Sequence, residues 1–203
     1  DNGYFLYYDN SVISADQAKS LDSILEAANK AGKKVLMDVS DGWYLASFFL
    51  GAGCTIGLDE NGKQVCDFNN ENGVKAGEAV KAFTANSAFI TGDNNILTGG
   101  MGDTICAGVS GTWNADAIQE KLGDHYAAAK LPTFTMDGKQ VQMGSFAGYK
   151  MIGINSQTKQ PVEAMKLAEW LTNEQNQLIR FERRAMGPSN IKASEDDRVK
   201  ENV

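Results

Sequence analysis

Three aromatic side chains lie directly after predicted strands, where a folded protein of this kind could bind a ligand. Trp43 and Tyr44 follow the short apolar segment 34–38, and Trp113 follows a second one, 103–109. Both segments have the composition of buried strands. In open α/β sheets the ligand lies outside the carboxyl ends of the strands, so the two junctions predict one shared crevice.

Sugar binding is the chemistry that this arrangement favours. Flat aromatic faces stack on the apolar C–H faces of a sugar ring, while Asp41, Asn114 and free backbone amides bind its hydroxyl groups. The alternative is that the same aromatic residues belong to the core or to a hinge. The pattern alone leaves both interpretations open.

The sequence offers no motif for catalysis or for a cofactor. The glycine cluster 99–102 is not followed by Lys-Ser or Lys-Thr, and segment 108–112 lacks the last glycine of a nucleophile elbow. His125 is the single histidine. We therefore expect a binding protein without cofactor or metal. A glycan-active enzyme is the alternative, and it would need two carboxylates facing the aromatic crevice.

The three cysteines fit no metal site, because no two of them are spaced as Cys-x-x-Cys. Cys54 and Cys66 flank a turn signal at Asn61-Gly62, so a disulfide across that hairpin is one interpretation. Buried free thiols, with Cys106 as the third, are the other.

The composition limits the class of partner. The 203 residues carry 19 Lys and Arg against 26 Asp and Glu, a net charge of −7, and this acidic balance argues against nucleic acid. The longest apolar run, 46–53, is far too short to span a bilayer. The length allows one large domain or two small ones. Because the chain lacks an initiator Met and ends in the charged run 195–203, we expect a piece of a longer protein.

Helical and strand patterns alternate along the chain, which predicts an α/β fold. Ser14 and Gln17 have the spacing of a capping box ahead of a helix that ends at Gly32. Asn61-Gly62 predicts a type I′ hairpin turn, and Asn72 is the expected cap of the next helix. The expected helices are 43–50, 74–86, a short one around 95–97, 115–121 and 160–184. The expected strands are 34–38, 54–58, 63–68, 103–109, 126–131 and 146–154, with a second hairpin turn at 137–138.

In this order the chain resembles the extracellular solute-binding proteins of sugar ABC transporters, especially the maltose/maltodextrin-binding proteins. The matching segments, in chain order, are 8–10, 32–37, 43–44, 51–53, 60–63, 111–113, 130–133, 148–155, 164–171 and 187–190. The resemblance implies a type II periplasmic-binding-protein-like lobe, with a mixed β-sheet flanked by helices. It also implies a two-lobed receptor that closes on an oligosaccharide, malto-oligosaccharide above all, and presents it to an ABC permease.

The resemblance carries over to individual residues. Tyr44 falls on a position that contacts the sugar, and Trp113 falls on the second stacking aromatic residue. Trp43 replaces a proline of the best-known relatives, and Gly42 replaces an acidic sugar ligand, for which Asp41 next to it can substitute. Tyr149 falls in a strand that usually lies near the hinge. A receptor for a non-sugar solute, such as a peptide or an amino acid, is the alternative. That class usually anchors a charged group with Arg, but Arg180, Arg183 and Arg184 of this chain lie far in sequence from the aromatic junctions.

The resemblance also divides the chain. Residues 1–143 match the core of the C-terminal lobe, and residues 144–203 match the hinge-crossing strand and helices that normally complete the other lobe. Alone, such a chain exposes apolar faces made for an absent lobe, so a domain-swapped homodimer is expected. The class implies the cell envelope, either periplasmic or lipid-anchored outside the membrane.

Overall fold

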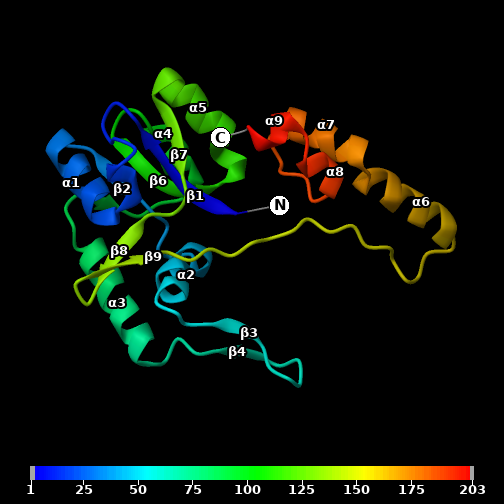
Figure 1. The fold of residues 1–203 in the computed structure, drawn as a ribbon, viewed down its shortest axis with the longest axis horizontal. Coiled ribbons are helices and arrows are strands. Elements are labelled where there is room, and N and C mark those ends of the chain that lie inside the picture. The colour runs from blue at the N-terminus through cyan, green and yellow to red at the C-terminus, as the bar shows by residue number, and fades with distance from the viewer. Residues whose placement is uncertain (1–2, 202–203) are drawn as a thin grey trace. The chain divides into compact units, whose positions relative to one another are not determined.

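The computed structural model describes residues 3–201 and divides into two compact units (Figure 1). The larger unit is Tyr4–Phe146. The smaller unit contains Gly3 and residues from Ala147 onward. Within residues 3–201, no helix is long and apolar enough to cross a membrane.

A five-stranded sheet forms the centre of the larger unit, in the order β5-β2-β6-β1-β7. Its strands are β1 (Tyr4–Asp9), β2 (Lys34–Leu36), β5 (Phe89–Ile90), β6 (Ile105–Gly111) and β7 (Tyr126–Ala129). β2 runs parallel to both β5 and β6, whereas β1 runs antiparallel to β6 and β7. The predicted α/β lobe with a mixed sheet is therefore confirmed.

Helices cover both faces of this sheet. The five are α1 (Leu21–Ala31), α2 (Gly42–Gly51), α3 (Glu71–Thr84), α4 (Asn94–Gly100) and α5 (Ala115–Leu122). One core contains Ile24 of α1 and Phe48 of α2, and the other contains Leu97 of α4 and Ile118 of α5. Side chains of β1 alternate between the two cores, as the period-2 geometry of a strand requires: Tyr4, Leu6 and Tyr8 enter the first core, while Phe5 and Tyr7 pack in the second.

The predicted capping box is present, but it lies at the start of a 3₁₀ turn and not at the start of the predicted α-helix. Gln17 Oε1 accepts from the Ser14 N–H at 2.9 Å, and the Ser14 hydroxyl accepts from the Gln17 N–H at 3.3 Å. The turn that follows is the 3₁₀ helix η1 (Gln17–Lys19), and α1 begins only at Leu21. Gly32 ends α1 with a φ of +67°, as its position predicted.

The first hairpin corrects the expected turn type. It joins β3 (Ile56–Leu58) to β4 (Gln64–Cys66), and Gly62 alone has a positive φ, +73°, where a type I′ turn needs two such residues. The Asp59 carboxylate accounts for the difference, because it accepts from the N–H groups of Asn61 and Lys63 at 2.9 and 2.8 Å. The second hairpin, β8 (Thr133–Met136) to β9 (Lys139–Gln142), has positive φ at both Asp137 and Gly138.

The expected start of α3 was also wrong. The cap is Asn70, whose side-chain oxygen accepts from the Gly73 N–H at 2.9 Å, because the helix begins at Glu71 rather than after Asn72. The structure shows all three cysteines as free thiols, Cys54 and Cys106 buried but Cys66 exposed on β4.

Helices make up the regular structure of the smaller unit, and residues 146–154, all described, include no β-strand but only one β-bridge residue, Gly148. The strand predicted there is wrong, because the described elements of this unit offer no sheet for it to join. The predicted helix 160–184 is broken into α6 (Pro161–Thr172) and α7 (Glu174–Arg184). Asn173 makes the break by accepting from the Asn176 N–H as the cap of α7.

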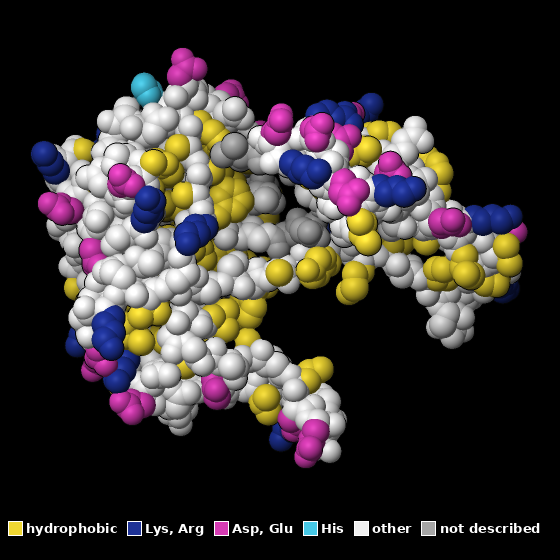
Figure 2. Space-filling view, viewed as in Figure 1, with side chains coloured by type: hydrophobic (Ala, Val, Ile, Leu, Met, Phe, Trp, Pro, Cys, Tyr) yellow, Lys and Arg dark blue, Asp and Glu magenta, His cyan; other side chains and the backbone are white. Residues whose placement is uncertain are grey.

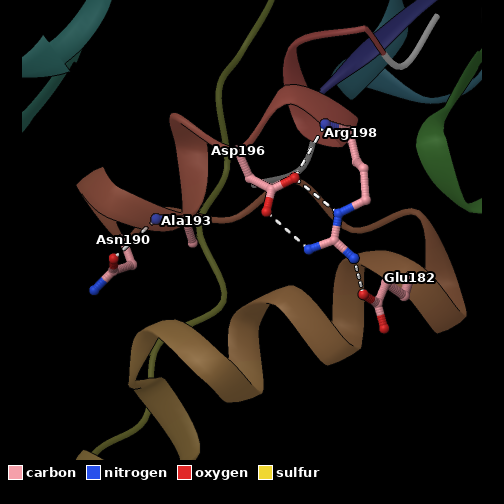
Figure 3. Close-up of polar contacts among 5 residues, drawn as sticks. All are labelled: Glu182, Asn190, Ala193, Asp196 and Arg198. Atoms are coloured by element: carbon pink, nitrogen blue, oxygen red, sulfur yellow. Dashed lines mark hydrogen bonds and ion pairs between the residues drawn. The ribbon is translucent and has the colours of Figure 1, made fainter.

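An ion-pair cluster ties the last helix of this unit to α7 (Figure 3). Short helices α8 (Ile191–Ser194) and α9 (Asp197–Lys200) follow α7. Arg198 of α9 bonds both Asp196, at 2.8 Å, and Glu182 of α7. The hydrogen bonds from Arg198 hold the pKa of Asp196 down at about 2.

Candidate functional site

The candidate site lies at one edge of the central sheet. Because β5, β2 and β6 are parallel, their carboxyl ends meet at this edge, and β1 begins there since Tyr4 pairs with Gly111. The loops beyond these strands carry Asp93 after β5, Asp41 after β2 and Trp113 after β6. Segments that lie far apart in sequence are thereby brought to one place, as the predicted crevice requires.

Trp113 is the aromatic side chain most available to a ligand at this edge. It lies in the 3₁₀ turn η2 (Thr112–Asn114) directly after β6, and 48% of it is exposed. Its ring packs over Gly111, where an added Cβ would come within 2.5 Å of ring atom Cε3 and closer still to Cζ3 and Cη2. The glycine therefore allows the indole to lie against the backbone with part of its surface open to solvent.

Trp43 is more deeply packed than Trp113. Its ring stacks on Phe146 at a centroid distance of 5.0 Å and meets the edge of Tyr4 at 5.8 Å. Among the described residues, the buried Trp43 Nε1 has no hydrogen-bond partner. The indole thus has one partner along its face, and it carries a free N–H donor.

Tyr44 is 6% exposed and packs edge-on against Tyr4 at 5.3 Å. Burial raises the pKa of its hydroxyl, which lies beside Ser110. The structure therefore brings Trp43, Tyr44 and Trp113 to the same edge of the sheet, but only Trp113 is substantially exposed. The core interpretation that the sequence left open describes Tyr44 well in this conformation.

Acidic side chains border the aromatic residues. Asp41 is exposed and caps α2, where one of its oxygens accepts from the Trp43 N–H at 2.8 Å. Asp93 caps α4 in the same way, and hydrogen bonds from the N–H groups of Ile96 and Asn95 lower its pKa. Each carboxylate is fixed by the helix start that it caps, which suits both to accept from sugar hydroxyl groups.

A polar triangle, buried at Ser110 and Asn114 but exposed at Asn94, was missed from the sequence. The side-chain oxygen of Asn94 accepts from the Ser110 hydroxyl at 3.0 Å and from Asn114 Nδ2 at 2.7 Å. Asn114 Nδ2 also donates to Ser110 Oγ at 2.8 Å. Asn114 was expected to bind ligand hydroxyls, but its amide nitrogen is engaged here. The sequence carries no signal for this triangle beyond the fact that both asparagines follow strands.

Tyr149 lies in the smaller unit, where it is 64% exposed. The other four candidates, Asp41, Trp43, Tyr44 and Trp113, belong to the larger unit. No group of His, Cys, Asp or Glu side chains in residues 3–201 is placed to hold a metal ion.

Comparison with known proteins identifies the family. The family described as "Bacterial extracellular solute-binding protein" matches residues 1–203. The chain belongs to this family. Its members are solute-binding proteins and not enzymes, which confirms the expectation of a binding protein rather than an enzyme. Because the family is extracellular, its members belong to the cell envelope.

Similar proteins agree with this assignment. The galactooligosaccharide-binding protein of Bacillus subtilis (strain 168) is 32% identical over 123 residues, 56% of this chain and 28% of that protein. A solved structure described as "with acarbose" is 33% identical with a TM-score of 0.86, over 98% of this chain and 52% of that one. The maltodextrin-binding protein MalE1 of L. casei BL23 is 26% identical with a TM-score of 0.78, over 99% and 53%. This chain therefore spans about half the length of the solved structures it matches.

Proposed function

We propose that this protein is the sugar-binding component of an ABC importer and that it binds an oligosaccharide, with malto-oligosaccharides as the first candidates. The observation that carries the proposal is the half-exposed indole of Trp113 at the carboxyl edge of the sheet, with the Asp41 and Asp93 carboxylates on neighbouring loops. An indole face and fixed acceptors are the two kinds of group that a sugar ring needs. The similar proteins named for maltodextrin, acarbose and galactooligosaccharide support the same substrate class.

In this proposal the chain contributes one lobe and part of the other. Residues 1–143 form the core of the C-terminal lobe, and residues 144–203 cross the hinge and complete the partner lobe. Trp43, Tyr44, Trp113 and Asp41 contact the sugar from the first lobe and Tyr149 contacts it near the hinge. Tyr44 reaches the sugar only if the loops at this edge open, because it is buried in the conformation described. The loaded receptor delivers the sugar to the membrane permease, and it is either lipid-anchored or periplasmic.

A tryptophan fluorescence titration tests the proposal. Maltose, maltotriose and maltotetraose are compared with lactose and a galactotriose, and sucrose serves as the control. We expect a saturable change for one of the two oligosaccharide series, reduced in Trp113→Ala and retained in Trp170→Ala. Trp170 is the matched control, because it is also about half exposed but belongs to the smaller unit. A flat response to every sugar, from this chain and from the longer receptor that contains it, would overturn the proposal.

The homodimer expected from the sequence is a separate proposal. Apolar side chains of α6 that are more than half exposed favour it: Val162, Met165, Leu167 and Trp170. Figure 2 shows hydrophobic side chains at the surface over this helix. Light scattering coupled to size-exclusion chromatography measures the mass, and a strictly monomeric protein at high concentration would contradict the swapped dimer.

A further inference from the structure

A short segment at the end of the larger unit packs against one side of the candidate site. Residues 143–147, which follow β9, are all described and form neither helix nor strand. They pass α2 (Figure 1), where the Gly144 N–H donates to the Ser47 carbonyl at 2.9 Å. A Cβ added at Gly144 would lie 2.6 Å from the Leu50 Cβ. Gly144 therefore fixes the segment closely against the helix.

The spacing of residues in α2 determines what this segment reaches next. Trp43, Ser47 and Leu50 are spaced i, i+4 and i+7, so they share one face of the helix. The segment contacts Leu50 and Ser47 through Gly144. Two residues further on, the Phe146 ring stacks on Trp43, with centroids 5.0 Å apart and planes inclined by 29°. Phe146 thereby lies at the first turn of α2, at the edge of the sheet that carries the candidate site.

The stacked ring occupies the kind of surface that a sugar needs. Tyr4 meets Trp43 at an interplanar angle of 60°, so among the described residues the stacked contact of this indole is the one with Phe146. An aromatic face that is covered by a phenylalanine ring cannot stack on a sugar ring at the same time. In the conformation described, Phe146 therefore takes the place that the C–H face of a sugar would take on Trp43.

The polar atom of the indole shows that this contact satisfies only part of Trp43. Its Nε1 is buried and has no hydrogen-bond partner among the described residues. A buried donor without a partner is costly, and a phenylalanine ring offers no oxygen to accept from it. A sugar has both an apolar face for the ring and hydroxyl oxygens for the N–H. The site thus favours exchange of Phe146 for a ligand of this kind.

The position of Phe146 allows such an exchange. It is the last residue of the larger unit, and its side chain is only partly buried. Because its backbone belongs to no helix or strand, the ring can leave Trp43 without breaking a strand pairing of the central sheet.

We infer that Phe146 is an affinity-determining residue of the sugar site, which stacks on Trp43 until a sugar ring displaces it. The inference rests on the proposed sugar-binding function. Apparent affinity falls in proportion to the fraction of molecules in which a site is open, so the stack weakens sugar binding. An aromatic pair of this geometry corresponds to about a fivefold change in an equilibrium constant.

Acrylamide quenching tests the stack without any sugar. With Trp113→Phe and Trp170→Phe in the background, Trp43 is the one tryptophan left in the sequence. Phe146→Ala should raise its quenching constant about twofold, because one of the two ring faces is uncovered. An unchanged quenching constant would overturn the inference.

A matched control is available in the same helix. Phe68 stacks on Phe49 of α2 with centroids 4.8 Å apart, so Phe68→Ala removes the same kind of ring from a different aromatic residue. It should leave the quenching of Trp43 unchanged. A rise as large as that in Phe146→Ala would mean that α2 has loosened as a whole, and it would contradict a specific stack.

Calorimetric titrations with maltotriose and with a galactotriose test the competition, in this chain and in the longer receptor that contains it. Phe146→Ala should bind the preferred sugar about fivefold more tightly than the wild type. Phe146→Leu, which keeps an apolar side chain without a flat face, should also bind more tightly. In a Trp43→Ala background, Phe146→Ala should change the affinity by almost nothing.

The outcomes separate this inference from the function on which it rests. If the wild type binds a sugar and Phe146→Ala binds it no more tightly, the competition is refuted and sugar binding stands. Binding by Phe146→Ala alone would support both. If neither protein binds either sugar, the proposed function fails and this inference fails with it, even where the quenching of Trp43 rises.

Discussion

Replacing Gly111 with alanine should displace the Trp113 indole without disrupting the sheet. The new Cβ would lie 2.5 Å or less from three ring atoms, whereas ordinary contacts begin at 3.4 Å. The ring must therefore move by about 1 Å or more, and since it is half exposed, it can swing toward solvent. The backbone at Gly111 has a φ of −87°, which alanine adopts without strain.

The size of the effect follows from the area that the ring loses. A tryptophan buries up to about 250 Å², and half of that at about 25 cal/mol per Å² gives an upper limit of about 3 kcal/mol. Partial repacking reduces the cost to about 1–2 kcal/mol, equivalent to a fall in Tm of about 3–6 °C. If Trp113 stacks on the sugar, the affinity should fall about tenfold, which corresponds to about 1.4 kcal/mol.

Thermal melts and maltotriose titrations measure the two effects. Gly57→Ala is the matched control, because this strand glycine has open space where its Cβ would be added. A double-mutant cycle isolates the cause: in a Trp113→Ala background, Gly111→Ala should cost almost nothing. The reasoning is refuted if Gly111→Ala shifts neither the Tm nor the emission of Trp113, or if it costs as much in the absence of the indole.

Three other perturbations have defined outcomes. Phe48→Ala should lower the free energy of unfolding by about 3–5 kcal/mol in urea melts, because the ring is fully buried, and a loss below 1 kcal/mol would mean that the site collapses around it. Because the pKa of Asp93 is lowered in the folded state, its carboxylate stabilises the fold at pH values above the ordinary aspartate pKa near 4. This stabilisation is lost as the pH falls through the lowered pKa. Asp93→Ala should therefore flatten the acid limb of the Tm profile, and an unchanged limb would contradict the cap. A disulfide-exchange reagent should label Cys66 quickly in the native state and label Cys54 and Cys106 only on unfolding, since burial raises the pKa of Cys106 to about 11. Absence of a fast thiol would instead indicate a bridge from Cys66 to Cys54.

Local patterns predicted the fold well where the local signal and the tertiary environment agree. The end of α1 at Gly32 follows from the left-handed backbone that glycine readily adopts. The placement of Trp113 follows from its position directly after β6, because the carboxyl ends of the parallel strands meet at one edge of the sheet. The strand at 146–154 failed, because β-propensity does not specify a partner strand. The polar triangle of Asn94, Ser110 and Asn114 could not be found either, since a side-chain network depends on packing that spacing alone does not reveal.

The order of the central sheet has a consequence for how the chain is made. β1 is synthesised before the other strands, yet both its neighbours, β6 and β7, follow about a hundred residues later. During translation both edges of the Tyr-rich strand stay unpaired until residue 111 has left the ribosome, and one edge stays unpaired until residue 129 has followed. Unpaired edges of this kind invite aggregation. Such non-local pairing also slows folding.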